Sequence, residues 1–339
     1  MKNNKKILIV GGAGFIGHNL ALQLNKLKYK VTIADSLQIN NILWLKKNKD
    51  KLPFPELSMG ILRERFRLLK KSKIPLLKVD VRDYDKLSKV FYKVKPHIVI
   101  HLAAVSHANK SNKDPLSTFD HSLRTLENSL DHSKNKIFNV KQFIFLSSSM
   151  VYGNFKKKSV NEKDICNPIG IYAALKLSGE NIIKAYNQVF GLPYTIIRPS
   201  ALYGERCISR RVGQIFIENV LNKKEIVIQG DGEEKLDFTY IDDLINGIIC
   251  VIKSKKAINE TFNLTYGNAQ PINKLIYFLK KSFPKIKVNY IPRDKLMPKR
   301  GTLSISKAKK LLNYKPRWSV NKGYQKYISW YKGFYNKDL

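Results

Sequence analysis

The chain has 339 residues, which predicts roughly two domains or lobes, and 43% of the residues are apolar, which excludes a mainly disordered protein. No apolar run approaches the ~20 residues of a membrane helix, and the run after the basic start is too short for a secretion signal, so a cytoplasmic protein without membrane contact is expected.

The net charge of +36 would suit binding to a polyanion. However, only 12 of the 62 basic residues are Arg and the lysines are spread along the chain, so no nucleic-acid binding is expected. Three cysteines without CxxC spacing indicate reduced thiols and no metal site.

Strand and helix patterns alternate through the first half of the chain. The expected strands are 5–10, 30–35, 76–80, 97–102 and 141–147, and the expected helices are 15–28, 84–94, 115–133 and 171–190. Short apolar runs separated by amphipathic helices are typical of βαβ units, which build parallel sheets. The sequence therefore predicts an α/β fold with a Rossmann doubly wound parallel sheet.

Two regions depart from this alternation. The Lys-rich segment 38–72 predicts two helices inserted between the second and third strands, which would form a solvated surface or, alternatively, a lid or partner surface. From 191 onward the pattern loosens into a smaller C-terminal α/β lobe. Its expected strands are 194–198, 225–229 and 260–264, its expected helices are 241–254, 272–281 and 304–312, and an aromatic-rich terminal helix at 318–335 would dock on the core.

A glycine-rich loop, GGAGFIG at 11–17, follows the first strand and opens a helix. Gly11 permits a tight turn, Gly14 lets the backbone approach a pyrophosphate, and Gly17 allows close packing of helix on strand. Asp35 ends the second strand, where a carboxylate accepts hydrogen bonds from the ribose hydroxyls of NAD and repels the 2′-phosphate of NADP. The expected contacts of an NAD cofactor here are Gly11, Gly14, Phe15, Ile16, Gly17 and Asp35.

The ends of the third and fourth strands add further candidates. Asp80 and Val81 would hold an adenine ring, although a plain helix cap explains Asp80 equally well. Small residues at 102–104 would let the backbone approach the cofactor. The expected contacts in this segment are Leu102, Ala103 and Ala104.

Tyr172 and Lys176 are four residues apart on an expected helix, so their side chains share one face. An ammonium beside a phenol favours the phenolate, and a Tyr with a lowered pKa acts as a general base toward an alcohol. Lys176 would also bind the nicotinamide ribose. A hydroxyl from 147–149, at the end of an upstream strand, is placed to hydrogen-bond the substrate oxygen.

Together these motifs resemble the extended short-chain dehydrogenase/reductase family, in particular its NAD-dependent epimerase/dehydratase branch acting on nucleotide sugars. The resemblance rests on GGAGFIG at 11–17, DVRD at 80–83, HLAA at 101–104, SSSMVYG at 147–153, YAALK at 172–176, RPSALYG at 198–204 and GDGEEKLDFTYIDD at 230–243. It implies an NAD-binding Rossmann domain at 1–190 with the helical insertion 38–72. It also implies a substrate lobe at 191–339, from which the strand 194–198 returns to the Rossmann sheet.

The resemblance assigns the catalytic hydroxyl to Ser148 and the catalytic pair to Tyr172 and Lys176. Dehydratases of this branch carry an acid after that hydroxyl, where this chain has Met150, which cannot transfer a proton. The resemblance therefore implies an NAD-dependent nucleotide-sugar 4-epimerase that works through a transient 4-keto intermediate, in service of cell-surface polysaccharide synthesis. The alternatives are a 4-dehydrogenase/4-ketoreductase or a dehydratase of the same family and, from another class, an NAD-binding regulatory protein. A homodimer formed by the helices at 115–133 and 171–190 is also implied.

The substrate lobe departs from the family pattern. The family's diphosphate-binding Arg before Asp-Phe is Leu236 here, its Asn in RPxN is Ala201, and a family Asn near the nicotinamide is replaced by His121. Arg206, Arg210 and Arg211 form an added basic cluster that would bind phosphate instead. The expected substrate contacts are Ser106, His107, Ser149, Met150, Ser200, Ala201, Arg210, Arg211, Lys235 and Arg300, and His107 and His121 are expected to face the substrate cleft.

Overall fold

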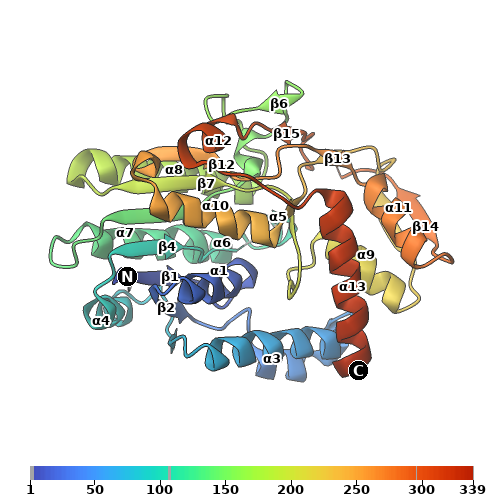
Figure 1. Cartoon of the computed structure of the whole chain (residues 1–339), viewed down its shortest axis with the longest axis horizontal. Coiled ribbons are helices and arrows are strands. Elements are labelled where there is room, and N and C mark those ends of the chain that lie inside the picture. The colour runs from blue at the N-terminus through green and yellow to red at the C-terminus, as the bar shows by residue number, and fades with distance from the viewer. Residues whose placement is uncertain (1–3, 106–107, 295, 339) are drawn as a thin grey trace.

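The computed structural model describes residues 4–105, 108–294 and 296–338 (Figure 1). Its centre is a seven-stranded sheet in the order β12-β7-β5-β4-β1-β2-β3, and every neighbouring pair in it is parallel. Its strands are β1 (Lys6–Val10), β2 (Lys30–Asp35), β3 (Leu76–Lys78), β4 (Ile98–His101), β5 (Gln142–Leu146), β7 (Tyr194–Arg198) and β12 (Glu260–Asn263). The central strands are buried along almost their whole length because helices cover both faces. The predicted Rossmann fold is confirmed.

One strand lies in a different part of the molecule from its expected place. The strand predicted at 260–264 was placed in the smaller lobe, but β12 is the edge strand of the main sheet and pairs with β7. More than sixty residues separate the two strands in the chain, so their pairing is a long-range contact that local patterns do not carry. The division into 1–190 and 191–339 stays a prediction, and both β7 and β12 come from its second part.

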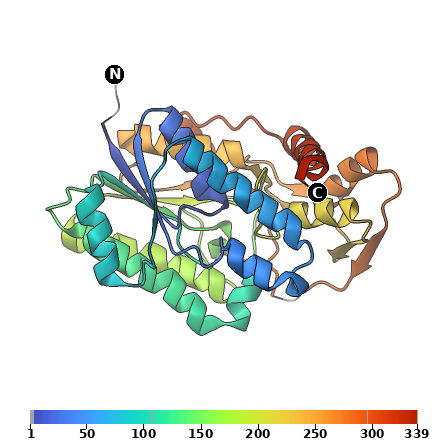
Figure 2. The ribbon, with the colours of Figure 1, turned by 90° about the horizontal axis from the view of Figure 1, so that it is seen from below.

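Helices form a layer on each side of the sheet (Figure 2). On one side lie α1 (Phe15–Lys26), α3 (Pro55–Lys71) and α10 (Ile241–Lys253), and on the other lie α4 (Tyr84–Val94), α7 (Thr125–Lys134) and α8 (Ile171–Phe190). The expected insertion of two helices is confirmed as α2 (Ile42–Lys47) and α3, joined by a short 3₁₀ turn, η1 (Lys49–Lys51). Helix α3 packs against α1 and against the C-terminal helix α13 (Val320–Asp338), so the insertion is part of the packed core.

The single helix expected at 115–133 is divided into three parts. Asp114 caps α6 (Pro115–Phe119), a π-helical turn η2 (Asp120–Arg124) follows, and α7 continues to Lys134. Such π-helical turns occur frequently at functional sites, because the extra residue redirects the side chains around it. His121 lies in this turn.

The remaining elements are short helices and short pairs of strands. The helical ones are α5 (Ala108–Lys113), η3 (Ser149–Tyr152), α9 (Val212–Leu221), η4 (Lys255–Ala257), α11 (Asn273–Ser282) and α12 (Ser306–Leu312). Short two-stranded pairs are formed by β6 (Ser159–Val160) with β15 (Thr302–Leu303), β8 (Leu202–Tyr203) with β11 (Thr239–Tyr240), β9 (Ile226–Gln229) with β14 (Val288–Ile291), and β10 (Lys235–Leu236) with β13 (Gln270–Pro271). The expected docking of the terminal helix is confirmed, because Tyr324, Tyr327 and Tyr331 of α13 are fully buried.

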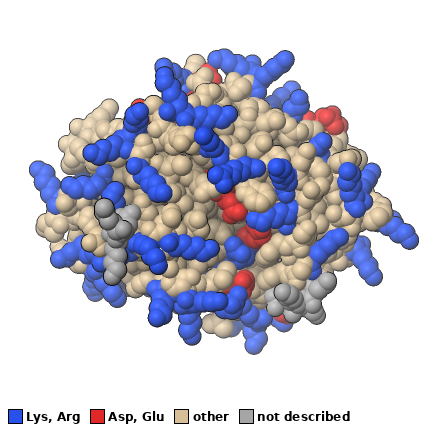
Figure 3. Space-filling view, viewed as in Figure 1, with Lys and Arg blue, Asp and Glu red and all other residues tan. Residues whose placement is uncertain are grey.

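The surface is basic over a wide area. On the face shown in Figure 3, Lys and Arg side chains are distributed across the whole view, with a few Asp and Glu near its centre. This face therefore carries no single concentrated basic patch. Among the helices in the described parts of the chain, none is long and apolar enough to cross a membrane.

Candidate active site

Two cavities meet at the carboxyl edge of the parallel sheet, where open α/β folds bind their ligands. The small cavity has a volume of about 200 Å³ and lies over the glycine loop and the ends of β2 and β4. The large cavity, about 560 Å³, lies between the end of β5, α8 and the C-terminal elements. Four residues line both cavities, namely Ile16, Leu102, Ala104 and Arg211. Two ligands, one in each cavity, would therefore contact each other at this junction.

The glycine loop has the geometry that a pyrophosphate needs. Gly11 has φ +75°, and a Cβ there would lie 2.6 Å from the backbone nitrogen of Ala103. A Cβ on Gly17 would lie 2.4 Å from the carbonyl oxygen of Gly12, whereas a Cβ on Gly14 would meet no atom nearer than 3.7 Å. Gly14 also caps α1 without a side-chain hydrogen bond, and the first turn carries no acidic residue, so its N–H groups are available to an anion. These residues fit NAD.

Asp35 is held at the end of β2 by two backbone donors. Its Oδ2 accepts a hydrogen bond from the Ala13 N–H at 2.9 Å, and its Oδ1 accepts one from the Leu37 N–H at 2.8 Å. Burial raises the pKa of Asp35, and these two hydrogen bonds and the charge of Arg65 act in the opposite direction. The carboxylate lines the small cavity and keeps lone pairs for ribose hydroxyls.

Asp80 and Val81 also line the small cavity. The cap of the following helix α4 is Asp83, whose side chain accepts from the Lys86 N–H. Asp80 is instead paired with Arg82 at 2.6 Å, and the hydrogen bond from Arg82 lowers the pKa of Asp80. The helix-cap explanation of Asp80 is therefore wrong, while an adenine contact stays a prediction.

Ser148, Tyr172 and Lys176 share the wall of the large cavity. Ser148 follows β5, and its Oγ accepts from the Met150 N–H at 3.1 Å. Lys176 is buried and donates from Nζ to the Leu146 carbonyl oxygen at 2.6 Å. Burial lowers the pKa of Lys176 to about 8, and the carboxylate of Glu180 opposes this effect.

The sequence predicted that Lys176 lowers the pKa of Tyr172, and the structure does not bear this out. Burial raises the pKa of Tyr172, because a phenolate there loses its hydration; the charge of Arg211 and a hydrogen bond with Ser148 act in the opposite direction. The Lys176 ammonium is engaged by the Leu146 carbonyl oxygen instead. The charge of Arg211 thus opposes part of the rise in the pKa of Tyr172.

Glu180 is a site-supporting residue that the sequence analysis missed. Its carboxylate accepts from the Ser147 hydroxyl at 2.5 Å and from Arg198 Nε and Nη2 at 2.9 and 2.6 Å, all in a buried setting. It follows Lys176 by one helical turn and so holds a negative charge near the buried ammonium. The four-residue spacing after Tyr172 and Lys176 is the signal that would have found it.

Arginines converge on the side of the large cavity formed by the C-terminal elements. Arg211 and Arg300 line the cavity, and Arg293 is ion-paired with Glu234 beside it. Among the described residues, the buried Nε atoms of Arg211, Arg293 and Arg300 have no hydrogen-bond partner. Burial lowers the pKa of Arg300 to about 10. Guanidinium groups whose buried Nε donors are unused suit an anionic ligand such as a diphosphate.

Several predicted substrate contacts do line the large cavity. They are Ser149, Met150, Ser200, Ala201, Arg210, Arg211 and Arg300. Ser106 and His107 lie outside the described residues. Lys235 is exposed and does not line the cavity, because successive residues of β10 point to opposite sides and the inward position is taken by Leu236.

The predicted basic cluster is not one site. Arg206 turns to α1, where its guanidinium donates to His18 and Asn19, so it lines neither cavity. Arg210 lines the large cavity but is ion-paired with Glu218 at 3.2 Å. Only Arg211 reaches the junction of the two cavities. His121 was expected to face the substrate cleft, but it lines the small cavity.

The chain was compared with protein families and with curated proteins. Residues 7–265 match the model of the NAD dependent epimerase/dehydratase family. Protein CapI of Staphylococcus aureus is 28% identical over 98% of this chain and 100% of its own length. The UDP-glucuronate 4-epimerase of Thermodesulfobacterium geofontis is 30% identical, over 96% of this chain and 95% of that protein.

The chain is also similar in fold to solved structures of UDP-sugar 4-epimerases. The UDP-glucuronic acid 4-epimerase of Bacillus cereus in complex with UDP-glucuronic acid and NAD superposes with a TM-score of 0.85 at 30% identity, covering 97% of this chain and 100% of that one. The UDP-glucose 4-epimerase of Thermotoga maritima with UDP-glucose has a TM-score of 0.82 at 27% identity, covering 96% and 98%. The likeness thus extends over both cavities.

Proposed function

Because the chain belongs to the NAD-dependent epimerase/dehydratase family, we propose that it inverts C4 of a nucleoside diphosphate sugar through a transient 4-keto intermediate. The enzyme uses NAD as its cofactor. One observation carries the proposal: the hydroxyls of Tyr172 and Ser148 belong to the wall of a large cavity that joins the cofactor cavity at Ile16, Leu102, Ala104 and Arg211. A sugar hydroxyl at that junction would meet both the base and the cofactor.

Each residue of the site then has a defined task. Tyr172 takes the proton of the C4 hydroxyl, and Ser148 hydrogen-bonds the same oxygen. Lys176 holds the nicotinamide ribose, and Arg211 offsets part of the cost of a buried phenolate. The residues of the small cavity would hold NAD, which would supply an acceptor and donor of hydride for C4. Inversion requires the 4-keto sugar to rotate before the hydride returns, and this rotation would take place in the 560 Å³ cavity.

Met150 separates this reaction from elimination. It lines the large cavity next to Ser149, at the position where dehydratases of the family carry an acid. A thioether exchanges no protons, so no group at this position can assist the loss of water. Reduction by the same Ser, Tyr and Lys remains the nearest alternative, because a 4-ketoreductase differs only in exchanging its cofactor after each turnover.

The nucleotide half of the substrate would lie along the arginines. Arg300 and Arg211, with their unused buried donors, are suited to the diphosphate. Uridine is the nucleoside we propose, because the relatives described above act on or bind UDP-sugars.

Proton NMR of UDP-glucose, UDP-glucuronate and other nucleotide sugars, each incubated with the enzyme and catalytic NAD, tests the proposal. Inversion at C4 without net NADH is the expected result. Stoichiometric use of NADH would show a reductase, and a 4-keto-6-deoxy product would show a dehydratase and overturn the argument from Met150. Binding of NAD without any turnover of the sugars would favour a regulatory protein.

We also propose that the enzyme is a homodimer in the cytoplasm and supplies sugars for cell-surface polysaccharide. Helices α6 and α8 lie side by side and expose apolar side chains, with Leu116 83% and Val189 71% exposed. Such side chains on adjacent helices suit an interface between two copies. A monomer by light scattering for the wild type would contradict the dimer. Leu116→Asp together with Val189→Asp is expected to dissociate it.

A further inference from the structure

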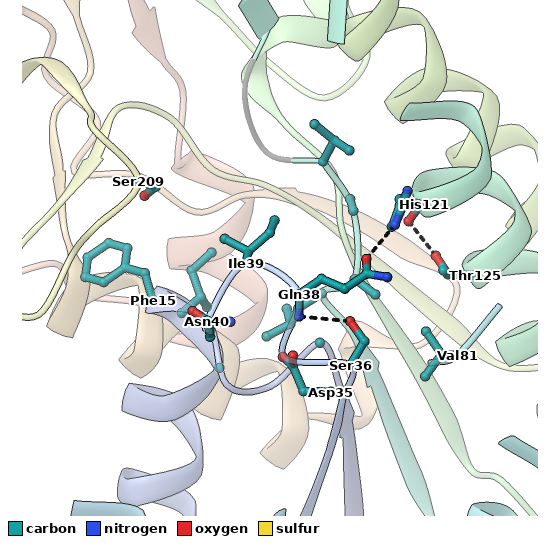
Figure 4. A pocket seen from close by; sticks show the side chains of 18 of the residues that line it. Phe15, Asp35, Ser36, Gln38, Ile39, Asn40, Val81, His121, Thr125 and Ser209 are labelled. Atoms are coloured by element: carbon teal, nitrogen blue, oxygen red, sulfur yellow. Dashed lines mark hydrogen bonds between the residues drawn. The ribbon is translucent and has the colours of Figure 1, made fainter. Parts of the chain in front are cut away.

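The segment 36–40, directly after β2, forms one wall of the small cavity (Figure 4). The side chain of Gln38 extends from this segment across the cavity toward His121, and its Oε1 lies 2.7 Å from His121 Nε2. The other ring nitrogen of His121 is bonded to the carbonyl oxygen of Ser117 at 2.7 Å. The imidazole is therefore held from both sides.

The segment is also fixed at its two ends. At its start, Asp35 accepts from the Leu37 N–H. At its end, Arg65 of the insertion helix α3 donates to the Asn40 side chain at 2.9 Å and to the Ala13 carbonyl oxygen at 3.4 Å. Arg65 is 1% exposed, and its two hydrogen bonds join the insertion to this segment and to the glycine loop of the cofactor cavity. A short segment fixed at both ends presents Gln38 at its middle.

The bond between Gln38 and His121 lies on the solvent side of the cavity. Gln38 is exposed, whereas Asp35 and Val81, which line the same cavity, are buried. Gln38 and His121 therefore lie on the exposed side of a dinucleotide that rests against Asp35 and Val81. A carboxamide offers an acceptor at one end and a donor at the other, so Gln38 can pair with Nε2 in either tautomer of the imidazole.

We propose that Gln38 and His121 form a strap that closes over bound NAD and keeps it on the enzyme between turnovers. The strap rests on the proposed function, since an epimerase returns its cofactor in the original oxidation state and has no need to exchange it. The insertion 38–72 then has a definite role, because it supplies both Gln38 and the Arg65 that supports the segment. Gln38 and His121 act here as positioning residues for the cofactor.

A chase experiment tests the strap without using the sugar. The enzyme is loaded with radiolabelled NAD and diluted into excess unlabelled NAD, and the label that remains bound is followed in time. Gln38→Ala and His121→Ala are each expected to release NAD about tenfold faster, the effect of losing one hydrogen bond of ~1.4 kcal/mol. The double variant is expected to release it no faster than either single variant, because both substitutions break the same bond.

The matched control is Leu43→Ala, on the helix that directly follows the segment. Leu43 is 72% exposed and does not line the small cavity, so its variant is expected to release NAD at the wild-type rate. Unchanged or slower release from Gln38→Ala, additive effects in the double variant, or complete loss of label from the wild type at once would each overturn the strap. If release is accelerated as expected but no sugar is inverted at C4, the proposed function fails while the strap stands.

Discussion

The small cavity and the large cavity of this enzyme are built in different ways. At the turn of Gly11 and the start of α1, the small cavity is lined by backbone that leaves no room for a side chain at Gly11 or Gly17, and side chains such as Asp35 and Gln38 line the rest. The walls of the large cavity are side chains from segments far apart in the chain, such as Ser148, Tyr172, Arg211 and Arg300. Backbone shape demands particular residues at particular positions, whereas a wall of side chains admits many solutions. Substitutions in the small cavity should therefore change folding or NAD binding, whereas substitutions in the large cavity should change turnover or the KM of the sugar.

The largest effect is expected in the large cavity. Tyr172→Phe removes the general base that we propose, so turnover followed by NMR should fall by about 10²–10⁴-fold. Retention of NAD should not change, because the phenyl ring preserves the packing. Tyr277→Phe, at an exposed tyrosine outside both cavities, is the control and should keep full activity. Substantial activity in Tyr172→Phe would remove this tyrosine from the mechanism.

Two glycines of the small cavity sharpen the contrast between shape and chemistry. Gly17→Ala forces a methyl group against the Gly12 backbone, so we expect a loss of about 1–3 kcal/mol or more in unfolding free energy. Gly14→Ala meets no protein atom nearer than 3.7 Å and should fold normally, yet its methyl group occupies the approach of the pyrophosphate. Urea unfolding and NAD binding, measured on both variants, separate the two effects. Equal stability of the two variants would contradict this interpretation.

Arg300, which lines the large cavity, and Lys235, which does not, test which cation binds the nucleotide sugar. Arg300→Met should raise KM for the nucleotide sugar about 10–100-fold, because a hydrogen bond to a charged group contributes ~1.5–3 kcal/mol. Lys235→Met should change KM by less than about twofold, since its ammonium lies outside the cavity. The reverse order would show that β10 turns its other side to the ligand when the substrate binds.

The smallest effect is a pH dependence of the cofactor-free protein. The pKa of Lys176 is about 8 in the folded state against 10.5 ordinarily, so the unfolded chain binds more protons between these values. Unfolding free energy should therefore rise with pH in this window, by about 1–2 kcal/mol from pH 8 to 9.5. Urea unfolding of the wild type and of Lys176→Met at both pH values measures the difference. An equal rise in both proteins would assign it to other groups.

Much of the fold and the cofactor half of the site could be predicted from sequence patterns. The strands around β1, the helix at 171–190 and the glycine loop follow from short-range periodicity and from steric rules that act within a few residues. The same rules placed Gly11, Gly14, Gly17 and Asp35 at one cavity. The strand β12 could not be placed in this way, because its position depends on a partner far away in the chain.

The sequence by itself therefore determined the class of fold and the glycine-loop residues that line the cofactor cavity, because both depend on local backbone geometry. The role of Tyr172 as a base stays a prediction. Only the tertiary structure decided that Arg211 reaches the junction of the two cavities and that Arg206 and Lys235 lie outside the large cavity. It also decided that Arg65 of the insertion donates to the glycine loop. A long side chain on a loop or a two-residue strand has several possible partners of similar energy. Its direction is set by packing between distant segments.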